Sequence, residues 1–273
     1  QNTITNQLNN DAIQVYSDSI NAHGSSHNVR IFRNNISDVT NGCCIGINSY
    51  DDRTAENLQI YYNVLIGAEK YGISLYHNDE RGGSPSSVDI FNNTIYGSEI
   101  RAINTTVNHP YILKNNIMAN TPSDNINSWN STSGLTSSNN LWNTNRLDGR
   151  VLQYDGISYT YTTITNFEAI TQTGDPLFTD SANDDFTLQT GSPAINAGAD
   201  VGFTQDINGN PIVGTPDIGA YESDFTDADT EKPIVTDFAV PDTSSSLVVA
   251  VSSFTATDNN SVTGFMLTES ATA

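Results

Sequence analysis

Apolar residues recur around an asparagine in a short pattern that appears four times in the first half of the chain. The clearest copy is VDIFNNTIY at residues 88–96, and the others lie at residues 29–39, 58–68 and, as a weaker match, 110–120. Aligned in one column, the asparagines are Asn34, Asn63, Asn93 and Asn115. The apolar residues three positions before them are Ile31, Ile60, Ile90 and Ile112, and those two positions after them are Ile36, Leu65, Ile95 and Ile117. This alternation predicts short β-strands with one buried face.

A second short strand pattern follows each asparagine at a nearly constant distance. Its central isoleucine stands 10 or 11 residues after the asparagine, counting from Asn2 for the first copy. These central residues are Ile13, Ile45, Ile73, Ile103 and Ile126. Successive asparagines, by contrast, are 22 to 32 residues apart. The spacing between the asparagine and the second strand is therefore nearly constant, and the connection that follows the second strand varies in length.

Such a repeat predicts a chain that coils so that each turn stacks on the one before. Equivalent strands then pair in parallel sheets, and their inward residues form one continuous core. Asparagine suits this coil, because it tolerates the left-handed backbone conformation of a sharp turn and stacked asparagine side chains can hydrogen-bond along the axis. An antiparallel sandwich, the alternative, does not require constant offsets between two registers. We predict an all-β parallel β-helix, a solenoid.

At these residues the chain resembles the right-handed parallel β-helix proteins of the pectate-lyase-like superfamily, over residues 1–145. The resemblance implies a right-handed solenoid. It does not select an activity, because that fold carries lyases, hydrolases, epimerases, adhesins and phage tailspikes.

The chain is strongly acidic, with a formal net charge of −21 at pH 7. It repels nucleic acid and anionic membranes at long range, so we expect neither as a partner, and it disfavours polyuronates unless a cation bridges them. Few lysines and only two cysteines are typical of a secreted bacterial protein that does not rely on disulfides, which predicts an extracellular or cell-surface location. No stretch reads as a signal peptide or a membrane span. Gln1 and Ala273 both fall inside strand patterns, so we interpret the chain as a fragment.

The two cysteines, Cys43 and Cys44, are neighbours in the sequence. Adjacent Cα atoms are about 3.8 Å apart, below the usual disulfide range, so a bond between them would be strained. Strand alternation predicts one side chain in the core and one outside. We expect ordinary packing rather than a redox or metal role.

Outward residues of the second strands form a candidate sugar-binding surface. Polar groups alternate there with aromatic rings, which can cover the apolar faces of pyranoses while amides meet the hydroxyls. The residues expected to bind carbohydrate are Tyr16, Asn48, Tyr76, Asn104 and Trp129. The alternative is an ordinary solvated sheet face that carries a few aromatic residues.

Two charged loops leave consecutive second strands, SYDDRTAE at residues 49–56 and YHNDERGG at residues 76–83, and we expect them to be neighbours in space. The acidic residues that could hold Ca²⁺, the expected cofactor, are Asp51, Asp52, Asp79 and Glu80. Arg53, His77 and Arg81 could bind or deprotonate a sugar, as a polysaccharide lyase requires. Paired carboxylates could instead serve glycoside hydrolysis. The alternative is a pair of solvated surface loops whose charges neutralise each other.

Residues 146–222 follow the repeat and are expected to form a terminal coil and cap. A Tyr/Thr-rich stretch predicts a hairpin, and TNFEAITQT predicts one or two helical turns. Residues 175–222 carry DPLF, a DF-x-L strand, GSPAI-x-AG and PDIGAYE in this order, and they resemble the segment that follows β-helix repeats in many secreted bacterial proteins. The resemblance implies a cap over the exposed end of the solenoid core. Capping turns explain its alternating oxygens more simply than Ca²⁺ does; these belong to Asp206, Asn208, Asn210 and Asp217.

The last part of the chain predicts a separate domain. Residues 223–232 are acidic and lack apolar periodicity, so they read as a linker. Residues 233–273 alternate as strands and resemble the opening strands of a bacterial immunoglobulin-like repeat, a partial β-sandwich truncated at the end of the sequence.

Three functions remain open from the sequence. The first hypothesis is a segment of a secreted or surface protein that binds a polysaccharide or cell-surface glycan along the solenoid face. The second is a polysaccharide lyase or glycoside hydrolase whose site lies at Arg53, His77 and Arg81 or partly in coils outside the sequence. The third is a structural spacer, adhesin or self-assembling filament subunit.

Overall fold

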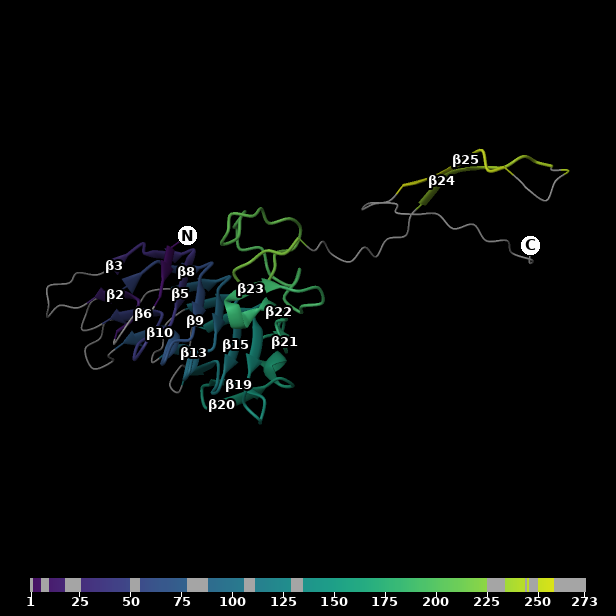
Figure 1. The fold of residues 1–273 in the computed structure, drawn as a ribbon. Coiled ribbons are helices and arrows are strands. Elements are labelled where there is room, and N and C mark those ends of the chain that lie inside the picture. Colours follow the sequence, from purple (N-terminus) through teal and green to yellow (C-terminus); the bar gives the residue numbers. More distant parts are fainter. Residues whose placement is uncertain are drawn as a thin grey trace. The chain divides into compact units, whose positions relative to one another are not determined.

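The computed structural model describes residues 2–5, 10–17, 26–49, 55–77, 88–105, 111–128, 135–224, 234–243, 245 and 250–257. The chain divides into two compact units, residues 1–225 and residues 226–273. In the first unit, short strands stack in parallel rows along one axis (Figure 1). The predicted all-β parallel solenoid is confirmed.

Three sheets run the length of the stack, and the chain visits them in turn. Sheet 1 contains β1 (Asn2–Ile4), β5 (Asn34–Ser37), β9 (Val64–Ile66), β12 (Thr94–Tyr96), β15 (Ile117–Thr121), β18 (Leu141–Thr144) and β21 (Gln172–Thr173). Sheet 2 contains β2 (Ile13–Ser17), β6 (Ile45–Ser49), β10 (Tyr71–His77), β13 (Arg101–Thr105), β16 (Ile126–Ser128), β19 (Arg150–Tyr154) and β20 (Ile157–Thr160). Sheet 3 contains β4 (Arg30–Phe32), β8 (Leu58–Tyr61), β11 (Val88–Phe91), β14 (Tyr111–Lys114) and β17 (Leu135–Ser138).

The remaining elements are small. β3 (Ser26–His27) pairs with β7 (Ala55–Glu56) in parallel, and β22 (Phe178–Asp180) forms an antiparallel hairpin with β23 (Asp185–Leu188). The helices among the described residues are two single 3-10 turns, η2 (Ile164–Asn166) and η3 (Ser181–Asn183). In the second unit, β24 (Ile234–Ala239) pairs antiparallel with β25 (Ser253–Thr257), where Phe238 and Phe254 meet edge to face.

The core consists of apolar residues stacked coil upon coil. On sheet 2 the register aligns all five predicted central isoleucines, and Leu152 continues the column. On sheet 3 the column contains Ile31, Ile60, Ile90 and Leu113, all buried. Each coil is too small to bury its own apolar face, so stability depends on neighbouring coils.

An asparagine ladder runs through the turn between sheet 3 and sheet 1. In each coil the Nδ2 of the asparagine donates to the Oδ1 of the asparagine in the next coil, at 2.9 to 3.1 Å. The ladder comprises Asn2, Asn34, Asn63, Asn93, Asn116 and Asn140. Since the backbone amide of Asn63 also donates to Asn93 Oδ1, at 3.0 Å, the side chains close the turn as well as link the coils.

The fourth repeat was aligned one residue too early. Asn116 stands in the ladder where Asn115 was predicted, and Leu113 replaces Ile112 in the core column. Met118 likewise takes the inward place assigned to Ile117, which packs on the outer side instead. Two adjacent asparagines and two adjacent apolar residues make both alignments possible in the sequence.

The left-handed turn residue also differs from the prediction. It is not the ladder asparagine but the residue before it, with φ between 51° and 57°. This column comprises Arg33, Tyr62, Asn92, Asn115 and Asn139. Its side chains therefore leave the turn on the side away from the ladder.

Both cysteines are buried; Cys44 packs in the main hydrophobic core, as alternation predicts for one of the two, and Cys43 is buried outside that core. Cys43 is 5% exposed and Cys44 is 0% exposed. Cys43 lies just before β6 rather than within it, and its backbone amide donates to Asp11 Oδ1 at 2.8 Å. Burial, with the Asp11 carboxylate as a second cause, raises the pKa of Cys43 to about 12.

Residues 150–171 cover the last coil. β20 folds back antiparallel on β19, and Ile164 of η2 joins the main core. Glu168, fully buried, ends the ladder: Asn140 donates to it through its backbone amide at 2.7 Å and through Nδ2 at 3.1 Å. The predicted hairpin forms and, together with η2, closes the end of the core. The stretch predicted to be helical, residues 165–173, does not form a helix: η2 ends at the second residue of this stretch, and its last two residues are β21.

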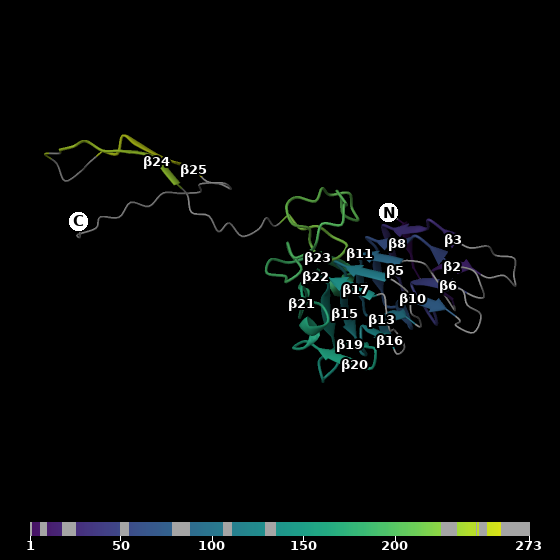
Figure 2. The ribbon, with the colours of Figure 1, turned by 180° about the vertical axis from the view of Figure 1, so that it is seen from behind.

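Residues 175–224, named here the return segment, do not cover that end as expected. They run back along the side of the solenoid toward the first coils (Figure 2). Asn139 Nδ2 donates to Ala197 O at 2.9 Å, Asn115 Nδ2 to Ala199 O at 2.7 Å and Asn92 Nδ2 to Asp217 O at 3.4 Å. The left-handed column thus anchors the segment, and the hairpin and helical turn do the capping.

Candidate functional site

The register of sheet 2 places the backbones of three predicted sugar-binding residues in one row. Tyr16 pairs with Asn48, and Asn48 pairs with Tyr76, on the adjacent strands β2, β6 and β10. Neighbouring strands are about 4.8 Å apart, so the two tyrosine backbones are about 10 Å from each other across Asn48. Asn48 is half-buried.

Asn104 belongs to the neighbouring row of sheet 2, as its position in the repeat predicts. Asn104 pairs with Ser74, which places it in the parallel row two residues earlier on each strand. That row contains Gln14, Gly46, Ser74, Asn104, Asn127 and Gln153. Trp129 lies outside the described residues.

A glycine in the second row makes room for a carboxylate that crosses between coils. A Cβ on Gly46 would lie 2.0 Å from Asp11 Oδ2, so any side chain there would require the Asp11 carboxylate to move. Asp11 reaches this place because it accepts the backbone amide of Cys43 in the next coil. The face beside Asn48 is therefore polar and negatively charged at its N-terminal end.

Most of the candidate catalytic and metal residues lie outside the described part of the chain. These residues are Asp51, Asp52, Arg53, Asp79, Glu80 and Arg81. His77 is the last residue of β10, and its backbone pairs with Ser49 at the end of β6. The strand ends that precede the two charged loops are therefore adjacent, while the loops themselves lie outside the described residues.

The carboxylates of the return segment accept hydrogen bonds from the backbone amides of turns. Asp206 accepts the backbone amides of Asn208, Asn210 and Glu222 at 2.8 to 3.1 Å. Asp217 accepts the backbone amide of Asn196 at 2.7 Å. Among the described residues, no three or more His, Cys, Asp and Glu side chains gather as a metal-binding group.

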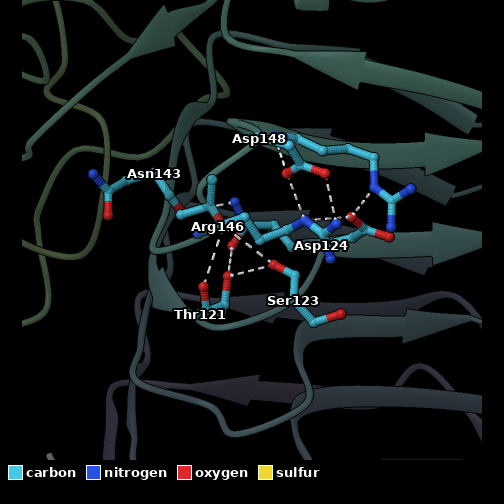
Figure 3. Close-up of polar contacts among 9 residues, drawn as sticks. Thr121, Ser123, Asp124, Asn143, Arg146 and Asp148 are labelled. Carbon is cyan, nitrogen blue, oxygen red and sulfur yellow. Dashed lines mark hydrogen bonds and ion pairs between the residues drawn. The ribbon is translucent and has the colours of Figure 1, made fainter.

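A polar cluster at the last coils was not anticipated from the sequence (Figure 3). Asp124, 1% exposed, accepts Arg150 Nε at 2.6 Å, and Arg146 Nε lies 3.8 Å from it. Arg146 also makes a bidentate pair with Asp148, which holds the pKa of Asp148 below its usual range. Both guanidinium groups are engaged with carboxylates, so the cluster fixes the turn before β19.

An aromatic group on sheet 3 was also missed. Phe32 stacks on Tyr61 with ring centroids 5.0 Å apart, and Tyr61 stacks on Phe203 of the return segment at 4.7 Å. Phe32 and Tyr61 occupy equivalent positions on β4 and β8, so their alignment was visible in the repeat. The contribution of Phe203 had no sequence signal, because it depends on the path of the return segment.

No known protein family and no curated protein matches this chain. Among the described residues, no helix combines the length and apolar character needed to cross a membrane. What the geometry establishes is a parallel β-solenoid with an internal asparagine ladder and a side-docked return segment.

Proposed function

We propose that the chain is a segment of a secreted or cell-surface bacterial β-helix protein that binds a glycan along the outward row of sheet 2. The observation that carries the proposal is the register of Tyr16, Asn48 and Tyr76 on three adjacent strands. Successive coils repeat the same outward position, and a glycan repeats the same sugar unit. Aromatic rings flanking an amide supply both the apolar and the hydrogen-bonding contacts of a pyranose.

The family part of the proposal rests on the motifs. The order DPLF, GSPAI and PDIGAYE supports membership of the right-handed, pectate-lyase-like β-helix proteins, and parallel crossover connections are right-handed in about 98% of cases. β24 and β25 support an immunoglobulin-like start of the second unit, since both are antiparallel neighbours.

Glycan arrays and affinity gels on the full chain test the binding. The variant with Tyr16→Ala and Tyr76→Ala should lose at least tenfold in affinity, whereas Leu147→Ala, at a fully exposed position, should bind like the wild type. Equal binding by the double variant and the wild type would refute the row as a glycan site.

The enzymatic alternative has one observation in its favour. The pairing of Ser49 with His77 brings the starts of both charged loops together, so Arg53, His77 and Arg81 are candidates for one site with Ca²⁺ at Asp51, Asp52, Asp79 and Glu80. Incubation with a panel of polysaccharides, with and without Ca²⁺, should then release unsaturated products or reducing ends. Absence of both products under both conditions would refute the enzymatic alternative.

A further inference from the structure

The turn that follows each strand of sheet 1 changes its residue type in the fourth repeat. Its left-handed residues, which follow paired strand residues, are Asp38, Gly67, Gly97 and Asn120, with φ between 56° and 69°. Glycine leaves this position without a side chain in the two repeats before Asn120. Asn120 therefore places an amide where its neighbours along the solenoid have none.

A β-bulge lies at the same place. Residues 119–120 of β15 lie opposite Asn143 alone in β18, so β15 carries one extra residue. The backbone amide of Asn120 donates to Asn143 Oδ1 at 3.2 Å, and the side chain of Asn145 donates to Asn120 Oδ1. Bulges redirect side chains and are over-represented next to active sites.

A pocket opens beside the bulge, between sheet 1 and the return segment. Its volume of about 390 Å³ lies within the range of about 300–1,000 Å³ that is typical of ligand sites. Asn120 and Asn145 line it from the solenoid, and Asp175, Leu177 and Gln189 line it from the return segment.

Two hydrogen bonds hold the walls of this pocket together. The hydroxyls of Tyr96 and Ser181 are 3.3 Å apart, and Asn143 Nδ2 donates to Gly174 O at 3.1 Å. The pocket is therefore already formed in the fold.

Leu177 adopts a backbone conformation that a bulky residue rarely takes, with φ of 52°. Its amide donates to Asp175 Oδ1 at 2.9 Å, and its carbonyl accepts the amide of Gln189 at 2.9 Å. Core packing does not explain the strain: Leu177 packs on none of the three core clusters of the described residues, whereas Phe178 packs on two. Strain of this kind concentrates at functional sites.

The pocket offers polar groups that a ligand can reach from solvent. Asn120 Nδ2 donates to no described residue, and it is not among the polar atoms that are buried without a partner. Asn145 Oδ1, Gln189 Oε1 and Asp175 Oδ2 accept no hydrogen bond from the described residues, and these three residues are exposed.

These groups restrict the chemistry of the ligand. One free donor and three free acceptors match sugar hydroxyls, because each hydroxyl both donates and accepts. The lining contains the carboxylate of Asp175 and, among the described residues, no cationic side chain, which disfavours an anion. Leu177 adds an apolar surface for the C–H groups of a sugar ring.

We propose that the pocket between the β15 bulge and the return segment binds a short stretch of a neutral glycan. Its hydroxyls accept from Asn120 Nδ2 and donate to the oxygens of Asn145, Asp175 and Gln189, while one ring lies against Leu177. The site is built on sheet 1, so it does not rest on the Tyr16 row of sheet 2.

Two substitutions separate binding from folding. Asn120→Asp replaces the reachable donor with an acceptor, keeps the oxygen that accepts Asn145, and installs the residue of the Asp38 turn. Leu177→Gly removes the apolar wall together with the backbone strain. Asn41→Asp, the same change at an exposed asparagine with φ of 55°, is the matched control.

All three variants should melt within about 2 °C of their parent, because none loses a fully buried side chain. A purely structural role for Asn120 or Leu177 predicts a larger drop in melting temperature with unchanged affinity at 25 °C.

Binding is measured by calorimetry and saturation-transfer NMR on the full chain carrying Tyr16→Ala and Tyr76→Ala, which removes the sheet 2 row. The probes are cellohexaose, xylohexaose, mannohexaose and hexagalacturonate. At least one neutral probe should bind this parent. Asn120→Asp should weaken that binding about tenfold or more and Leu177→Gly about threefold, while Asn41→Asp should leave it unchanged.

Four results would overturn the pocket: no neutral probe bound by the parent, a preference for hexagalacturonate, parental affinity in Asn120→Asp, or equal weakening by Asn41→Asp. The row is judged separately, by comparing the parent with the wild-type chain. Equal binding by these two proteins refutes the row and leaves the pocket intact, whereas binding by the wild type alone supports the row and refutes the pocket.

Discussion

The contribution of the asparagine ladder to stability can be measured most directly at Asn93. The side chain is fully buried; its Nδ2 donates to Asn116 Oδ1, Ile60 O and Phe91 O at 2.9 to 3.0 Å. Its Oδ1 accepts both the backbone amide and the Nδ2 of Asn63. The Nδ2 of Asn63 keeps two other carbonyl acceptors when Asn93 is removed, but its backbone amide keeps none that the hydrogen-bond network shows.

Asn93→Ala should therefore cost about 2–4 kcal/mol of unfolding free energy, of which one orphaned amide contributes about 1–3 kcal/mol and the cavity contributes the rest. Asn93→Asp has nearly the same volume but points a second oxygen at three acceptors. We expect it to cost about 3–5 kcal/mol at pH 7, as for an uncompensated buried charge. If the ladder only filled space, the near-isosteric aspartate would be the milder change.

Urea unfolding followed by circular dichroism at constant protein concentration gives the comparison. Asn166→Ala, at an exposed asparagine, serves as control and should stay within about 0.5 kcal/mol of the wild type. The reasoning is wrong if Asn93→Asp is as stable as Asn93→Ala at pH 7.

Three further predictions follow from buried and anchoring groups. Burial, with Asp217 and Asp206 as lesser causes, raises the pKa of Glu222 from 4.5 to about 7, so the stabilisation that its protonated form provides is complete below about pH 4.5 and is lost as the pH rises through about 7. Glu222→Gln should thus gain stability relative to the wild type across that window in thermal melts, and a constant difference would count against the shift. Cys43 and Cys44 should react with a thiol reagent at pH 8 only in denaturant, because burial raises both pKa values, and rapid labelling of the native protein would contradict this. Asn115→Ala, which removes two hydrogen bonds to Ala199, should speed proteolysis of the return segment while leaving the ladder intact, and an unchanged cleavage rate would show that the anchor is elsewhere.

The repeat was readable from the sequence because each strand register depends on side chains that recur at fixed offsets. The sheet 2 isoleucines needed no information beyond their spacing. The ladder position in the fourth coil needed more information, because residues 112–116, ILKNN, contain two adjacent apolar residues and two adjacent asparagines and so allow two alignments one residue apart. What decides between them is which asparagine takes the left-handed conformation; Asn115 takes it, and its side chain bonds Ala199 in a segment 84 residues away.

For the same reason, local sequence patterns could not predict where the return segment lies or which residue ends the ladder. The GSPAI and PDIGAYE motifs specify turns, but their place on the solenoid is set by amides from coils that precede them in the chain. Glu168 looked like an ordinary polar residue in a short helical stretch. Its role follows from Asn140, whose donors have no further coil above them and are satisfied by a carboxylate.

The ladder also explains which positions of this fold tolerate insertions and which tolerate only substitutions. The turn from sheet 3 to sheet 1 is the same length in every coil, because its asparagine bonds both neighbours and an insertion would break two hydrogen bonds per coil. The connection from sheet 2 to sheet 3 differs in length between coils: β6 and β8 are separated by residues 50–57, and β13 and β14 by residues 106–110. New loops are therefore tolerated beside the Tyr16 row. In the fixed turn only substitution is available, and the position open to it is the left-handed one, whose side chain leaves the ladder undisturbed; Arg33 and Tyr62 occupy that position.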